Sequence, residues 1–292
     1  MIPKEVIQNI RRIQITTSRM VSDVFSGQYH SVFKGRGMEF DEVREYQPGD
    51  EIRSIDWNVT ARMGHPFVKK FVEERELTVM LMLDKSASSL FGTVKQLKNR
   101  LAAEICSLLA FSAIRNNDKV GLIIFTDEVE KFVAPRKGTS HVLRVIREAL
   151  YFEPLSRGTD ISGALEYLNR VTPRRAVTFI ISDFYSPDYR KMLAIANKRH
   201  DIVAITINDA CEQEIPDVGL ITLDDPETSE SVTVDTSDPG FRREYRKRAR
   251  RRIEERDSLF RNCGVDSVNL STGVPYAQSL FAFFRKRQRR MQ

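Results

Sequence analysis

The sequence predicts an α/β protein whose central sheet is doubly wound and mostly parallel. Its first sign is a set of continuous apolar runs, each about the length of one strand and typical of strands buried on both faces. Helical patterns separate these runs, and strands that alternate with helices indicate a parallel sheet. The four runs are residues 77–83, 120–125, 176–181 and 202–207.

Composition excludes several other classes of protein. The 292-residue chain is 41% hydrophobic and 29% charged, which is ordinary for a soluble globular protein. No run approaches the roughly 18 apolar residues of a membrane-spanning helix, and the first residues lack the pattern of a signal peptide. The three cysteines, Cys106, Cys211 and Cys263, have no disulfide-framework or zinc-site spacing. We therefore expect a cytoplasmic protein.

The first 76 residues differ in pattern from the rest. Apolar residues spaced by three and four predict a helix over the first 24 residues, and residues 27–40 show no clear period. Pro48-Gly49 marks a turn, and residues 67–74 alternate like a strand. We divide the chain into an N-terminal segment, 1–76, and a larger domain, 77–292.

The larger domain continues with further helices and short strands. Helices are predicted over residues 93–115, 139–151, 161–170, 187–198, 241–262 and 276–287, the fifth of them strongly basic. Short strands are predicted at 129–133 and 265–270, and two more within 219–236 around the turn at Asp224-Asp225-Pro226.

Oxygen-bearing side chains follow two of the buried strands. Asp84, Ser86 and Ser88 form a D-x-S-x-S element directly after the first run, and Asp183 stands two residues after the third. Thr159 lies between them, just before a helix. Because ligands of a doubly wound sheet bind at the carboxyl ends of its strands, these five side chains are the candidate site.

These residue types favour a hard divalent cation. Carboxylate and hydroxyl oxygens suit Mg²⁺ or Mn²⁺ rather than Zn²⁺, and Mg²⁺ takes six oxygens in an octahedron. A position left open would accept a carboxylate from another protein. A lone D-x-S-x-S is a weak signal, since Asp and Ser are common in turns and caps. Thr159 alone could be a helix cap and Asp183 a turn residue, and we expect Lys85 to point away from the ion.

The five residues together resemble the metal-ion-dependent adhesion site of von Willebrand factor A domains. By this resemblance, Asp84, Ser86 and Ser88 match its first element, Thr159 its separate threonine and Asp183 its distal aspartate. The resemblance implies a von Willebrand factor A-like, Rossmann-type fold with one bound Mg²⁺ (or Mn²⁺).

The N-terminal segment resembles the signature of domain-of-unknown-function family fifty-eight. The matching residues are Gly35, Gly37, Phe40, Arg44, Tyr46, Gly49, Asp50, Arg53, Ile55, Asp56, Trp57, Thr60, Ala61 and Arg62. Proteins of that family join this signature to a von Willebrand A-like domain and are thought to act with MoxR-type AAA+ ATPases. The resemblance implies an adaptor or chaperone-like role. Within the segment we expect an ion network of Arg44, Arg53, Asp56 and Arg62, with Trp57 as an apolar anchor on the sheet. The alternative is that the segment forms a second surface for a partner.

Two other functions remain alternatives. The sequence holds no P-loop, nucleophile elbow or H-E-x-x-H motif, so we do not expect an enzyme, although a metal-dependent hydrolase using Asp84 and Asp183 is conceivable. The net charge of +6 is concentrated at residues 242–252 and 285–290, which could bind nucleic acid in a salt-dependent way. Helical geometry spreads these cations around the helix beside glutamates, which favours a solvated face or an acidic protein partner.

Overall fold

The computed structural model describes residues 39–72, 76–93, 96–224 and 230–291. They belong to two compact units, one within Phe33–Leu77 and one that includes everything from Thr78 onward, and each unit is described by itself. The helix predicted over the first 24 residues lies outside the described residues. The division of the chain into segments 1–76 and 77–292 therefore stays a prediction.

The small unit is a two-stranded antiparallel sheet with a short helix. Its strands are β1 (Glu39–Glu45) and β2 (Phe67–Val72), and between them lie a 3-10 turn, η1 (Ile52–Ser54), and α3 (Trp57–Met63). The carboxylate of Asp56 caps α3 by accepting hydrogen bonds from the second and third backbone N–H groups after it.

The ion pairs of this unit differ from the predicted network. The guanidinium of Arg44 donates two hydrogen bonds, of 2.7 and 2.8 Å, to the carboxylate of Asp50, and Asp56 pairs with Lys69 at 3.3 Å. Two members thus take partners outside the predicted set. Trp57 is 66% exposed, and because this unit is described by itself, the anchoring of its ring on the sheet stays a prediction.

The larger unit contains the predicted sheet, with six strands. Five neighbouring strands are parallel, and the edge strand β5 runs antiparallel to β4. In spatial order the strands are β10 (Asp266–Ser271), β7 (Asp201–Asn208), β6 (Val177–Ser182), β3 (Thr78–Asp84), β4 (Lys119–Phe125) and β5 (Val129–Arg136). The prediction of a mostly parallel sheet is confirmed.

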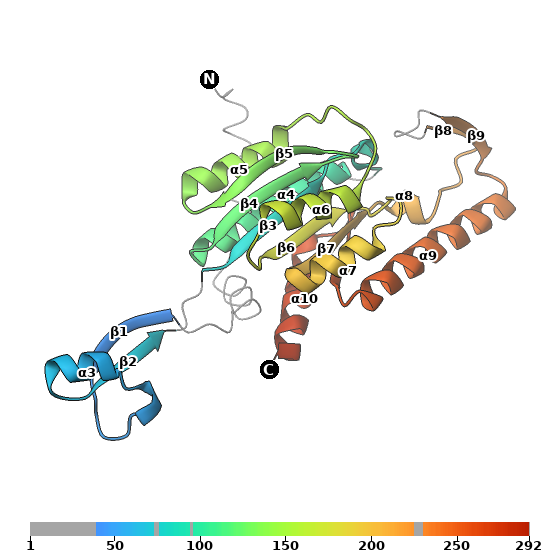
Figure 1. Cartoon of the computed structure of the whole chain (residues 1–292). Helices are drawn as coiled ribbons and strands as arrows, with labels where there is room; N and C mark the ends of the chain where they lie inside the picture. The colour runs from blue at the N-terminus through green and yellow to red at the C-terminus, as the bar shows by residue number, and fades with distance from the viewer. Residues whose placement is uncertain (1–38, 73–75, 94–95, 225–229, 292) are drawn as a thin grey trace. The chain divides into compact units, whose positions relative to one another are not determined.

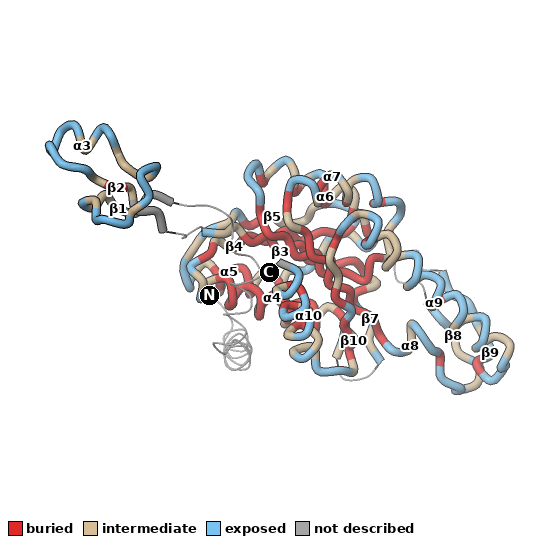
Figure 2. The backbone as a smooth tube through the Cα atoms, turned by 90° about the horizontal axis from the view of Figure 1, so that it is seen from below, coloured by how far each residue is buried: buried red, intermediate tan, exposed pale blue. Residues whose placement is uncertain are grey.

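Helices cover both faces of this sheet, as Figures 1 and 2 show. Helices α6 and α7 pack together on one face, and α4 and α5 on the other. The helices are α4 (Lys98–Arg115), α5 (Thr139–Tyr151), α6 (Ile161–Val171), α7 (Arg190–Arg199), α8 (Ala210–Gln213), α9 (Pro239–Asn262) and α10 (Tyr276–Met291). The strands β8 (Leu220–Asp224) and β9 (Ser231–Asp235) form a separate hairpin near α9.

The core lies between the sheet and its helices, where the tube in Figure 2 is red. Alternate residues of the central strands, such as Met80 and Met82, point to the face covered by α6 and α7. They pack with Leu165 and Leu168 of α6 and with Phe260 near the end of α9. Burial on both faces explains why these strands are continuously apolar in sequence. Within the described residues, no helix is long and apolar enough to cross a bilayer.

Two helices begin later than predicted. Helix α4 starts at Lys98 rather than near residue 93, and the preceding Leu97 is extended. The backbone N–H of Thr93 donates to the distant carboxylate of Asp209 at 3.0 Å, so this residue has a partner outside the helix. Helix α7 starts at Arg190, whose N–H is held by the side chain of Asp188 at 3.1 Å.

The imidazole of His200, at the end of α7, is buried against the start of β6. Its Nδ1 accepts a hydrogen bond of 3.3 Å from the backbone N–H of Ala176, so this nitrogen carries no proton. Burial, with the nearby charges of Arg199 and Arg175, lowers the pKa of His200 from 6.5 to about 4. The folded protein therefore resists protonation that the unfolded chain accepts.

Replacing His200 with Asn should flatten the acid side of the stability curve. As pH falls from about 6.5 to 4, the unfolded chain takes up a proton that the folded state does not, so the free energy of unfolding falls over that window. In the His200→Asn variant this contribution disappears. Urea unfolding at several pH values measures it, and parallel curves for the two proteins between pH 6.5 and 4 would contradict the prediction.

Candidate metal centre

The parallel pairing of β3 with β6 brings the two predicted aspartates to one edge of the sheet. In this register Leu83 lies opposite Ile181, so Asp84 and Asp183 follow neighbouring strand ends. The hydroxyl of Ser182 donates a 2.6 Å hydrogen bond to Oδ2 of Asp84. Both aspartates are nearly completely buried.

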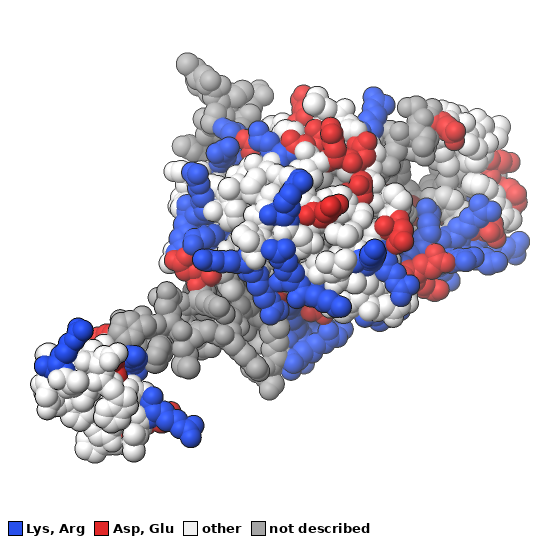
Figure 3. Space-filling model, viewed as in Figure 1, with Lys and Arg blue, Asp and Glu red and all other residues white. Residues whose placement is uncertain are grey.

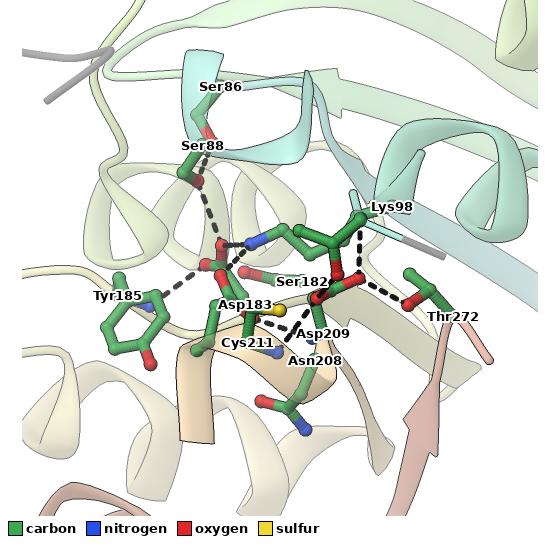
Figure 4. Close-up of polar contacts among 12 residues, drawn as sticks. Ser86, Ser88, Lys98, Ser182, Asp183, Tyr185, Asn208, Asp209, Cys211 and Thr272 are labelled. Atoms are coloured by element: carbon green, nitrogen blue, oxygen red, sulfur yellow. Dashed lines mark hydrogen bonds and ion pairs between the residues drawn. The ribbon is translucent and has the colours of Figure 1, made fainter. Parts of the chain in front are cut away.

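The serines of the D-x-S-x-S element lie between these carboxylates. The backbone N–H of Ser86 donates to Oδ1 of Asp84 at 2.9 Å, and the hydroxyls of Ser86 and Ser88 share a hydrogen bond of 3.1 Å. The hydroxyl of Ser88 then donates to Oδ2 of Asp183 at 2.9 Å (Figure 4). Four of the five predicted site residues therefore belong to one hydrogen-bonded network.

The fifth predicted residue, Thr159, lies on a loop tied to both segments. Its backbone carbonyl accepts a 3.2 Å hydrogen bond from the hydroxyl of Ser186, shortly after β6. Two residues earlier, the carbonyl of Arg157 accepts a hydrogen bond of 2.9 Å from the N–H of Ala87. The residue that caps α6 is Asp160, so the alternative that Thr159 serves as this cap is wrong. Thr159 is 6% exposed.

A strained turn follows Asp183. Phe184 adopts a φ of 63°, which non-glycine residues rarely take. Its N–H donates to the hydroxyl of Ser182 at 2.8 Å, and the N–H of Tyr185 donates to Oδ1 of Asp183 at 3.1 Å. The ring of Phe184 packs edge-on against Phe260 at 4.9 Å. Such strain costs about 1–3 kcal/mol and persists only where the surroundings hold it.

The electrostatics of the site favour a positive charge. The pKa of Asp84 is raised to about 7, first by burial and then by the negative charge of Asp183. Hydrogen bonds from Ser182 and Ser86 oppose this shift without cancelling it. Two mutually repelling buried carboxylates beside two hydroxyls are a donor set that fits a hard divalent cation such as Mg²⁺. Asp84, Ser86, Ser88 and Asp183 would hold it, with Thr159 on the adjoining loop.

The sequence analysis missed a lysine inside this site. The ammonium of Lys98 is 2.7 Å from Oδ2 of Asp183 and 2.6 Å from Oε1 of Glu212, and its side chain is 2% exposed. Burial alone would lower the pKa of Lys98, but the two carboxylates raise it overall. A signal was present in the sequence, because Lys98 shares a helix face with the apolar residues Leu101, Ala102 and Ile105.

A second buried carboxylate, Asp209, holds the surroundings of Lys98 together. It accepts hydrogen bonds from both the N–H and the hydroxyl of Thr93, from the N–H of Cys211 at 3.0 Å and from the hydroxyl of Thr272 at 2.6 Å. Glu212 in turn accepts from the N–H of Asp209 at 2.7 Å, which completes a capping box at the start of α8. Glu212, one of the two partners of Lys98, is thereby fixed in place.

The other lysine near the site, Lys85, has a different neighbour. It is 7% exposed, and burial lowers its pKa. Its charge acts on the thiol of Cys106 in α4, whose pKa burial raises to about 12. The expectation that Lys85 faces away from the aspartates agrees with this neighbour.

The sequence matches the family described as "Protein of unknown function DUF58" over residues 42–255. The chain belongs to this family. The match spans the small unit and most of the sheet domain, including all five predicted site residues.

Several bacterial proteins are similar to this chain over part or nearly all of its length. Uncharacterized proteins of Mycobacterium tuberculosis (strain ATCC 25618 / H37Rv) and Mycobacterium bovis are each 31% identical over 283 residues, which cover 96% of this chain and 89% of theirs. The uncharacterized protein YeaD of Bacillus subtilis is 24% identical over 173 residues, 58% of this chain and 40% of its own.

Several solved structures are similar to this chain, with low TM-scores. BatB from Bacteroides thetaiotaomicron is 16% identical with a TM-score of 0.45, and covers 73% of this chain and 99% of its own. An aerotolerance-related membrane protein from Bacteroides fragilis reaches 0.47 at 17% identity, covering 74% of this chain and 100% of its own. The SpRpn10 VWA domain reaches 0.38 at 11%, covering 73% and 95%. At these scores the fold assignment rests on the strand order of the sheet itself.

The basic helix α9 carries acidic residues among its cations, which Figure 3 shows interspersed. Arg248 pairs with Glu244 at 3.1 Å, and Arg251 with Glu255 at 2.8 Å, both one helical turn apart. Arg242 pairs with an aspartate, Asp217, at 2.9 Å. Several of its charges are thus neutralised within the protein.

The Asp209→Ala substitution should strongly destabilise the domain. It leaves several buried donors without their acceptor, at a cost of about 3 kcal/mol or more in the free energy of unfolding. Asp217→Ala is the control, because its carboxylate is 56% exposed and should contribute less than about 1 kcal/mol. Urea unfolding measures both, and similar losses in the two variants would contradict the role given to Asp209.

Proposed function

We propose that this protein is a protein-interaction module that binds a partner through one divalent cation, Mg²⁺ or Mn²⁺, at the edge of its sheet. The observation that carries the proposal is the meeting of Asp84 and Asp183, two buried carboxylates that repel each other, with the hydroxyls of Ser86 and Ser88. A cation that both carboxylates share removes their repulsion, and oxygen donors alone suit Mg²⁺.

The residues of the site have separate roles in this proposal. Asp84 orients the D-x-S-x-S segment through the N–H of Ser86, and Ser88 connects that segment to Asp183. Thr159 reaches the same edge on its own loop. Once bound, the ion would provide a positive charge to which a carboxylate of the partner binds.

We further propose that this module is not an enzyme. Binding requires only that the side chains of the site stay fixed, and the site is built in that way. The N–H groups of Ser86 and Tyr185 hold the two aspartates from the backbone side. Groups locked by such contacts support recognition at a fixed point on the surface.

The partner proposed is a MoxR-type AAA+ ATPase or its client, with which the protein would act as an adaptor in the cytoplasm. This part rests on the family resemblance. The alternative of nucleic-acid binding through α9 is less well supported, because Glu244 and Glu255 pair with two of its arginines.

Affinity capture tests the proposed function directly. Tagged protein is incubated with lysate of its native organism in Mg²⁺ and in EDTA, and bound proteins are identified by mass spectrometry. We expect the wild-type protein to retain an AAA+ ATPase or its client in Mg²⁺ and not in EDTA. The Asp84→Asn variant should retain neither protein. Equal retention in Mg²⁺ and EDTA would exclude the ion as the contact.

Asp84→Asn should abolish cation binding while the fold remains. The amide keeps the shape of the side chain but loses the charge. Mutation of groups that only support a metal ligand already lowers affinity roughly 10- to 100-fold, so the loss of this carboxylate should lower Mg²⁺ affinity about 100-fold or more. Asp84→Ala should have the same effect on affinity. Asp188→Asn is the control, since it removes an equal charge from an exposed position nearby. Calorimetry measures affinity and near-ultraviolet dichroism the fold, and unchanged affinity in Asp84→Asn would refute the assignment.

A further inference from the structure

The ammonium of Lys98 already occupies the position of a counter-charge at the candidate metal centre. It lies 2.7 Å from Oδ2 of Asp183, an oxygen that also accepts the hydrogen bond from Ser88. The side chains of Lys98 and Asp183 are 2% and 3% exposed. The proposed distal metal ligand is therefore neutralised by the chain itself.

The surroundings hold this ammonium in place. Lys98 is the first residue of α4, so a helix fixes its backbone. The rings of Phe91 and Tyr185 each lie 6.0 Å from the ammonium, a distance at which aromatic faces attract cations. Glu212 also contacts the ammonium, at 2.6 Å. Two rings and two carboxylates thus enclose one positive charge.

We infer that Lys98 is an internal competitor of the divalent cation and sets the cation affinity of the site. This inference rests on the proposed function. A cation that binds Asp183 must share its oxygen with the ammonium or displace it, and two positive charges close together repel each other. In the cation-free protein, conversely, Lys98 removes the need for a metal at Asp183.

Glu212 makes this competition possible without leaving a bare buried charge. When Asp183 is taken by the cation, Lys98 keeps its second carboxylate at Glu212, whose position the capping box with Asp209 fixes. Burying an unpaired ammonium would be costly. The pair of carboxylates therefore gives Lys98 one partner it can release and one that it retains.

The test compares Mg²⁺ binding in the wild-type chain and in Lys98→Met. The substitution removes a repelling charge from the cation-bound protein and a neutralising charge from the cation-free one. Both effects strengthen binding, and we expect affinity to rise about tenfold or more, equivalent to about 1.4 kcal/mol. Calorimetry with MgCl₂ measures this. Lys191→Met, which removes an equal charge from an exposed position on α7, should leave affinity unchanged.

Thermal unfolding provides a second readout. Without Mg²⁺, Lys98→Met leaves Asp183 and Glu212 without their shared cation, so its melting temperature should fall below that of the wild type. Added Mg²⁺ should then raise the melting temperature of the variant more than that of the wild type, because tighter binding stabilises more.

A double variant keeps the inference testable if Lys98→Met folds poorly. Lys98→Met with Glu212→Gln removes one positive and one negative charge, so the net charge of the site stays the same. Tighter Mg²⁺ binding in this variant would report the absence of the ammonium from Asp183 rather than a change in overall charge.

Three results would overturn the inference. Equal affinity in the wild type and both Lys98 variants would show that the ammonium does not compete, while the proposed cation site would stand. Weaker binding in both variants would show that Lys98 instead positions Asp183 for the ion. If no protein in the series bound Mg²⁺, the proposed function would fall together with the inference.

Discussion

The repulsion between Asp84 and Asp183 is the constraint around which this end of the protein is arranged. Parallel pairing of β3 and β6 forces two carboxylates into one buried edge, and burying charge is unfavourable unless it is paired or hydrogen-bonded. The hydroxyls of Ser182 and Ser88 and the ammonium of Lys98 all point to these oxygens. Each of these contacts therefore lowers the cost of burying the two carboxylates together.

Contacts beyond the aspartates make the arrangement rigid and connect it to the surface helices. Phe184, next to Asp183, adopts a left-handed backbone conformation, and its ring packs on Phe260 of α9. From α8, the carbonyl of Cys211 accepts a hydrogen bond of 2.9 Å from the hydroxyl of Tyr245. Because Glu212 lies in that same short helix, the neighbourhood of Lys98 is in direct contact with the basic helix.

Much of the sheet and part of the site could be predicted from sequence, for physical reasons. Strands buried on both faces are continuously apolar, so β3, β4, β6 and β7 are visible as runs, and polar residues at their ends are visible as breaks. What failed depends on partners distant in sequence. Asp209 gives Thr93 a partner outside α4, and Asp183 and Glu212 make a buried lysine tolerable. The pairing of Arg44 with Asp50 was missed for a different reason: it joins the end of β1 to the turn that follows, and such a local contact leaves no periodic pattern in the sequence.

The hydrogen bonds of the site also determine at which stage of folding the site can form. They join residues far apart in the chain: 98 positions from Asp84 to Ser182, 114 from Lys98 to Glu212 and 116 from Thr93 to Asp209. Contacts of such separation close large loops and form late. A nascent chain that has emerged only as far as β4 carries the D-x-S-x-S element but neither Asp183 nor Glu212. The emerging polypeptide therefore cannot form this site until nearly the entire sheet has been synthesised and assembled.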